Sequence, residues 1–111
     1  MANIVNQYGI DAAGNVARTN IVGTNYTVPA SRRLLITDFG MDSEPVGTAR
    51  VFFQDVTGGV DLDDLYLPAA GTIHRTYGTP IEVAAAHVLN LDYIQGVAGQ
   101  ISLFFHGILE T

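Results

Sequence analysis

The sequence predicts one all-β domain, a single antiparallel β-sandwich with jelly-roll-like connections and about eight strands. Three observations lead to this prediction. Apolar and polar residues alternate in short runs, β-branched and aromatic residues are frequent in those runs, and Gly or Pro separates them at short intervals. No segment has the apolar spacing of an amphipathic helix, and 111 residues suit one domain with one core.

The predicted strands follow one another from residue 25 onward. NYTV at 25–28 leads into Pro29, and RRLLITDFGM at 32–41 carries apolar residues on both of its faces. Turn-forming residues at 42–47 predict a loop. Further strands are predicted at 48–56, 62–67, 71–83, 87–93 and 100–110.

Two of these strands have special features. Gly78 and Pro80 interrupt 71–83, so this segment is predicted to form two short strands or one kinked strand at a sheet edge. The run QISLFFHGILE at 100–110 is almost continuously apolar. We expect it to lie centrally in a sheet, either buried on both faces or forming a subunit contact.

Residues 1–24 differ from the rest of the chain, because they are rich in Asn, Ala, Gly and Thr with only scattered apolar residues. Such a segment specifies its strand register weakly. We expect it to form an extended arm that binds a neighbouring chain, or the first strand or hairpin of the sandwich with a turn at 11–15, and the two are compatible. We slightly favour a strand for 3–8. The predicted organisation is an N-terminal arm or first hairpin at 1–24 and a β-sandwich domain at 25–111.

The composition predicts a surface for a protein partner. Hydrophobic residues make up 48% of the chain and charged residues 14%, and the charged share lies well below the roughly one quarter of typical soluble domains. Few charges are therefore available to cover the surface, and large exposed apolar patches mark contact sites. We expect a homo-oligomer that also binds other chains.

The charge argues against two classes of partner. The net charge is −6, with five Arg and no Lys. Binding to nucleic acid or to an anionic membrane depends on clustered Lys and Arg, so we expect neither. Arg without Lys is typical of protein interfaces, and a codon bias of the genome explains it equally well.

The start of the chain lacks the basic and apolar regions of a signal peptide, and no apolar run approaches the roughly 20 residues that span a bilayer. We therefore expect synthesis in a cytoplasm, where the protein stays until it is assembled. The chain has no Cys, and hence no disulfide or thiol nucleophile.

Motifs of enzymatic chemistry are missing from the sequence. It has no phosphate-binding glycine loop, no GxSxG and no HExxH. The three His, at positions 74, 87 and 106, do not have the spacing of metal ligands on one element. We expect no catalytic residues, no cofactor and no enzymatic activity. His106 interrupts an apolar strand and needs a polar partner there.

One loop region collects carboxylates. Four of them flank Gly58 and Gly59, and a flexible loop of oxygen ligands suits Ca²⁺; they are Asp55, Asp61, Asp63 and Asp64. Their spacing matches no EF-hand template, so an ordinary solvated loop is the favoured interpretation and these residues are weak metal candidates.

Four segments carry a resemblance to a known class of proteins: YTVPASRRLLITDFGM, TARVFFQD, LPAAGTIHRTYGTPIEVAAAHVLNL and GQISLFFHGIL. In this order they resemble small β-sandwich structural proteins of tailed bacteriophages, namely capsid decoration (cement) proteins and the jelly-roll heads of phage fibres. The resemblance covers residues 25–111 in overall organisation. It implies a homotrimer on the virion surface that clamps the major capsid protein lattice, often through an N-terminal arm.

The resemblance also suggests contact residues. The arm would bind the capsid through Ile4, Val5, Tyr8 and Ile10, and the last strand would make subunit contacts through Phe104, Phe105 and His106. For the two Phe residues, burial in the sandwich core is a strong alternative.

Two other functions remain open. A receptor- or carbohydrate-binding module of a phage fibre or tail would need a concave aromatic and carboxylate site, for which the loop at 55–64 is the candidate. A small jelly-roll enzyme of the cupin type would need His and carboxylate side chains that converge inside the barrel, and it is the least favoured.

Overall fold

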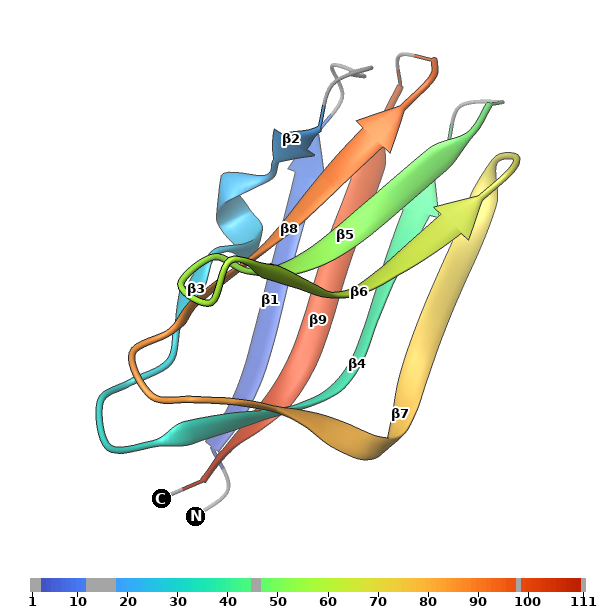
Figure 1. The fold of residues 1–111 in the computed structure, drawn as a ribbon. Helices are drawn as coiled ribbons and strands as arrows, with labels where there is room; N and C mark the ends of the chain where they lie inside the picture. Colours follow the sequence, from blue (N-terminus) through green and yellow to red (C-terminus); the bar gives the residue numbers. More distant parts are fainter. Residues whose placement is uncertain (1–2, 12–17, 45–46, 98, 111) are drawn as a thin grey trace.

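The computed structural model describes residues 3–11, 18–44, 47–97 and 99–110. Its strands lie in two facing sheets (Figure 1). A short 3-10 helix, η1, covers Val22–Thr24. The strands are β1 (Asn3–Asp11), β2 (Thr19–Asn20), β3 (Tyr26–Thr27), β4 (Arg33–Ser43), β5 (Ala49–Asp55), β6 (Val60–Leu67), β7 (Gly71–Val83), β8 (Val88–Gln95) and β9 (Ile101–Glu110).

The order of the strands is that of a jelly roll. Sheet A has the order β1-β9-β4-β7, and sheet B has the order β2-β8-β5-β6, with β3 also paired to β8. β2 and β3 lie along successive parts of β8 and so share one position. From the ends of the chain inward, β1 pairs with β9, β2 and β3 pair with β8, β4 pairs with β7, and β5 pairs with β6. All of these pairs are antiparallel. The predicted fold class is confirmed.

The core lies between the two sheets and follows the alternation in the sequence. On β9, Ile101, Leu103 and Phe105 are fully buried. Phe105 of sheet A meets Phe53 of sheet B, with their ring centroids 4.7 Å apart. Both sheets thus supply large side chains to one continuous core.

The strands from β4 to β9 begin and end within two residues of the predicted bounds. β7 is one strand at the edge of sheet A. Ile36 pairs with Ile81 and Asp38 with Thr76, so a bulge accommodates residues 77–80, where Gly78 and Pro80 stand. The predicted loop at 42–47 starts later than expected because β4 continues through Ser43, and its residues 45–46 lie outside the described part of the chain.

β9 lies centrally between β1 and β4, as predicted, but only its inner face is fully buried. Residues 3–11 form β1, which pairs with β9 along its whole length. Most of the predicted turn at 11–15 lies outside the described residues. Among the described residues, no helix is sufficiently long and apolar to cross a membrane.

Candidate interaction surface

The outer side of β1 and β9 exposes large apolar side chains. Ile4 is 69% exposed and Tyr8 56%. The register sets Ile4 opposite Ile108 and Tyr8 opposite Phe104. Residues directly opposite in an antiparallel pair point to the same side of the sheet. We call this surface the β1–β9 face, and it comprises Ile4, Asn6, Tyr8, Ile10, Phe104, His106 and Ile108.

The β1–β9 face brings together residues from both predicted contact sets. Tyr8 of the predicted capsid contact lies directly opposite Phe104 of the predicted subunit contact. The structure places Val5 and Phe105 elsewhere, because both point into the core and are 6% and 0% exposed. Those two side chains are therefore not available to another chain, whereas the remaining predicted residues form one surface.

The absence of a side chain at Gly40 on β4 leaves room for the Phe104 ring. Gly40 lies opposite Phe104, and a Cβ atom at Gly40 would lie 2.6 Å from Cζ of Phe104 and 2.7 Å from the carbonyl oxygen of Ile73. Phe104 thus folds across the neighbouring strand. Its ring lies 5.5 Å from that of His74 and 5.3 Å from that of His106.

Beside this ring, one carboxylate binds two imidazoles. Nε2 of His74 lies 2.8 Å and Nδ1 of His106 2.7 Å from the same Oδ2 atom of Asp38. The bulge between Ile36 and Asp38 turns the Asp38 side chain to the outer face, opposite His106. This arrangement supplies the polar partner that His106 was expected to need.

The environment of Asp38 lowers its pKa from the ordinary value of 3.8. Desolvation by partial burial acts in the opposite direction, but the hydrogen bonds from Thr37, His74 and His106 outweigh it. Oγ1 of Thr37 donates to Oδ1 of Asp38 at 2.7 Å. Asp38 therefore anchors a polar cluster next to the apolar β1–β9 face.

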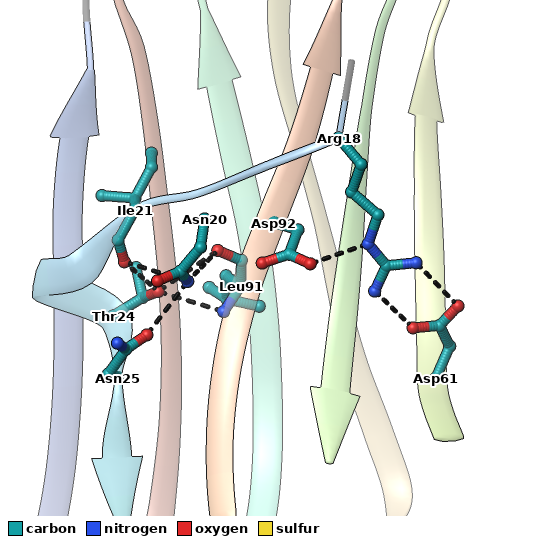
Figure 2. A network of polar contacts seen from close by, with 8 residues as sticks. All are labelled: Arg18, Asn20, Ile21, Thr24, Asn25, Asp61, Leu91 and Asp92. Carbon is teal, nitrogen blue, oxygen red and sulfur yellow. Dashed lines mark hydrogen bonds and ion pairs between the residues drawn. The ribbon is translucent and has the colours of Figure 1, made fainter. Parts of the chain in front are cut away.

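The outer side of sheet B is covered differently, by an arginine that spans three strands. The guanidinium of Arg18 donates to both carboxylate oxygens of Asp61 on β6, at 2.6 and 3.1 Å, and through Nε to Asp92 on β8, at 2.7 Å. Figure 2 shows Arg18 between these two carboxylates. The hydrogen bond from Arg18, opposed by partial burial, lowers the pKa of Asp61.

Two arginines cover the phenylalanine beneath them. The guanidinium carbons of Arg18 and Arg50 lie 4.2 and 4.8 Å from the centre of the Phe52 ring. Arg50 is itself bound to Asp64 on β6. Phe52 is only 8% exposed although it points to the outer side of the sheet. The apolar surface of β5 is thus covered from within the chain.

The segment that carries Arg18 is tied to β8 by further hydrogen bonds. Nδ2 of Asn20 donates to the carbonyl oxygen of Leu91 at 3.2 Å, and the Leu91 amide donates to Oγ1 of Thr24 at 3.0 Å (Figure 2). Thr24 is fully buried. Residues 18–25 are therefore part of sheet B and its edge.

The four Asp of the loop region do not converge. Each has its own partner: Asp55 binds His87 and the amide of Gly58, Asp61 binds Arg18, Asp63 binds Arg75 and Tyr77, and Asp64 binds Arg50. Among the residues that the structure describes, no group of three or more His, Cys, Asp or Glu could hold a metal ion. These carboxylates act as acceptors that fasten neighbouring strands.

The sequence analysis missed the hydrogen-bonded groups around Arg18 and around Asp38. The two carboxylate partners of Arg18 lie 43 and 74 residues away in the sequence, and the two histidine partners of Asp38 lie 36 and 68 residues away. No local pattern marks such pairs, because only the register of the two sheets brings them together. The one signal was the polar His106 within an apolar strand.

Comparison with known proteins shows the fold. No family model and no curated protein sequence matches this chain. Among solved structures, PirA has a TM-score of 0.57 at 11% identity, covering 92% of both chains. A chain of the disulfide-linked pili of Bacillus endospore appendages has a TM-score of 0.54 at 11% identity, covering 100% of this chain and 90% of the other.

A carbohydrate-binding domain is similar too. The CBM36-1 domain of a multidomain xylanase from the hindgut metagenome of Trinervitermes trinervoides has a TM-score of 0.51 at 14% identity, covering 100% of this chain and 98% of the other. At such low identities the likeness concerns the fold alone. The chain is thus a small jelly-roll β-sandwich, of a fold that also occurs in a pilus protein and in a carbohydrate-binding module.

Proposed function

We propose that the protein is a non-enzymatic virion structural protein, a capsid decoration protein that oligomerises and binds the major capsid protein lattice on the capsid surface. The observation that carries this proposal is the β1–β9 face, where Ile4, Tyr8 and Ile10 are each at least half exposed. These side chains would be buried favourably by another protein, because contiguous exposed apolar surface marks contact sites.

The contrast with sheet B supports the choice of surface. On the outer side of sheet B, Phe52 is covered by Arg18 and Arg50, whose charges are paired within the chain. A partner would have to break or desolvate those pairs, which is costly. The β1–β9 face presents no such obstacle at Ile4, Tyr8 and Ile10.

The nature of the partner follows from the charge and the sequence resemblance. A net charge of −6 without Lys disfavours nucleic acid and anionic membranes. A partner that binds only the folded domain also stabilises it. The resemblance to cement proteins suggests the capsid lattice and a trimer.

A pair of exposed tyrosines provides the test. Tyr8 is 56% exposed on the β1–β9 face, and Tyr66 is 55% exposed on the outer side of sheet B. We expect Tyr8→Ser to weaken cosedimentation with capsids of the virus that encodes the chain by about tenfold or more, since an aromatic anchor is lost. Tyr66→Ser should bind as the wild type does. Equal binding by both variants, or no binding by the wild type, would overturn the proposal.

A second candidate is a receptor- or carbohydrate-binding module of a phage fibre or tail. The observation that favours it is the exposed Tyr8 beside Phe104, since aromatic side chains offer an apolar body with a polar tip for recognition. A glycan array separates the two functions. A glycan bound by the wild type and by Tyr66→Ser, but not by Tyr8→Ser, would favour the module over the cement protein.

A further inference from the structure

The edges of the two sheets are protected unequally. An edge strand presents unpaired backbone groups to any other strand, and charges, Pro and bulges normally prevent such pairing. β7 carries Pro80 and the bulge at 77–80. β6 carries Asp61, Asp63 and Asp64 and a register shift opposite Phe53 and Gln54. β2 and β3 are only two residues long.

β1 has none of these protections. It is nine residues long, its register with β9 is unbroken, and it has neither a charged residue before Asp11 nor a Pro. Among the described residues, β9 is the only strand paired with it. It is the edge that a foreign strand would extend most readily.

One half of this edge is covered and the other half is open. η1 lies against β1 at Tyr8 and Gly9, since a Cβ atom at Gly23 would lie 2.9 Å from the carbonyl oxygen of Tyr8 and 3.4 Å from Cα of Gly9. In the described part of the chain, no backbone hydrogen bond outside the sheet involves residues 3–7. Within the described part of the chain, the open part of this edge is therefore Asn3–Gln7.

The best candidate for a strand on this edge is β1 of a second copy. Two copies with a net charge of −6 repel each other, so they meet most easily where the surface is uncharged, and residues 3–7 carry no charge. Antiparallel pairing of one strand with itself follows a two-fold axis, which is the commonest symmetry of soluble oligomers. Ile4 and Asn6 alternate with Val5 and Gln7 on the two faces, so a second β1 continues both faces of sheet A.

We propose that two copies of the protein pair antiparallel through Asn3–Gln7 of β1, which joins their sheets A into one continuous sheet. This inference rests on the oligomerisation in the proposed function, but replaces the trimer that the resemblance suggests with a two-fold dimer, and its test needs no capsid. The contact is short, about five residues on each side, so it is weak and depends on protein concentration. Two-fold pairing gives dimers, whereas a closed trimer requires a different contact.

Charge complementation tests the proposal. Asn6 is exposed at the open part of β1. With Val5 on the two-fold axis, Asn6 of one copy lies opposite Ile4 of the other copy and diagonally across from its Asn6, about 7–8 Å away. We expect Asn6→Lys and Asn6→Glu each to weaken self-association by about fivefold or more, because two like charges then lie close together on either side of the axis. Mixing the two variants in equal amounts should restore dimers that contain one copy of each, measured by native mass spectrometry over a concentration series.

Matched variants on the opposite edge provide the control. Thr72 is exposed on β7 of the same sheet, and Thr72→Lys and Thr72→Glu should dimerise as the wild type does. The proposal is overturned if the wild type stays monomeric, if it forms trimers that are insensitive to Asn6, or if mixing restores nothing. Capsid binding by a monomer would overturn only this inference, and dimers that do not bind capsids would overturn only the lattice function.

Discussion

The outer sides of the two sheets both carry aromatic side chains, but in the described part of the chain arginine side chains cover such a ring only on sheet B. Each is a β-surface with aromatic residues that face away from the core, Phe52 on sheet B and Tyr8 with Phe104 on sheet A. On sheet B, Arg18 and Arg50 cover the aromatic ring and are neutralised by carboxylates of the same chain. On the β1–β9 face, no described residue covers Tyr8 in this way, and its side chain is 56% exposed. The difference indicates that Phe52 is covered by groups of the same chain, whereas Tyr8 is available to a partner.

The largest expected effect comes from Gly40, which shapes the β1–β9 face. Gly40→Ala would place a Cβ atom 2.7 Å from the carbonyl oxygen of Ile73, which as backbone cannot turn away, as well as against the Phe104 ring. We expect a loss of about 3 kcal/mol in the free energy of unfolding, at the upper end for overpacking, because one of the two clashes is with backbone. Urea denaturation measures it.

Gly78 provides the matched control for this substitution. It lies in the bulged part of β7, and no atom approaches a Cβ atom there within 4 Å. Gly78→Ala should leave the stability almost unchanged. If the two variants were equally stable, the packing of Phe104 over Gly40 would not be as described.

The next effect concerns the cover of sheet B. Arg18→Ala leaves Asp92, whose side chain is 10% exposed, without its cationic partner, and it uncovers Phe52. We expect a loss of about 2 kcal/mol in unfolding free energy, since a largely buried acceptor loses its donor. Thermal and urea denaturation provide the measurement.

Arg33 is the comparison for Arg18, because it also joins two carboxylates, Glu82 and Glu110. All three of these side chains are well exposed, and exposed ion pairs contribute little. Arg33→Ala should therefore be nearly as stable as the wild type. A larger loss of unfolding free energy for Arg33→Ala than for Arg18→Ala would contradict the view that the hydrogen bonds and the ring contact of Arg18 stabilise sheet B.

A smaller effect depends on pH, through the cluster beside the β1–β9 face. The pKa of Asp38 is lower in the folded state than its ordinary value of 3.8. Asp38 thus stabilises the fold above the pKa of the unfolded chain, and this stability is lost as the pH falls through the lower, folded pKa. The decline of unfolding free energy in acid should be shallower for Asp38→Asn, as measured by urea denaturation below pH 5. Identical pH profiles would show that the ionised Asp38 adds no stability.

The sequence predicted the strands because their alternation is local. In the run that became β8, Leu89, Leu91 and Tyr93 recur at every second position, and these are the residues that enter the core. The bulge in β7 was predictable in the same way, from Gly78 and Pro80.

The surface could not be predicted with the same certainty, because alternation does not tell which of two faces is buried. Phe104 and Phe105 are equally apolar, and only the pairing with β1 and β4 sends Phe105 into the core and Phe104 outward. Arg18 carried no local sign of its role either, because its acceptors lie on β6 and β8.

The central claim is that partners meet the protein at β1 of sheet A and not on the outer side of sheet B. Amide hydrogen exchange of the capsid-bound protein, compared with that of the free protein, tests it most directly. The account predicts slower exchange on capsid binding in β1 and β9, which form the β1–β9 face, with β5 and β6 unchanged. Slower exchange confined to β5 and β6 would contradict it, and would place the contact over Arg18 and Arg50.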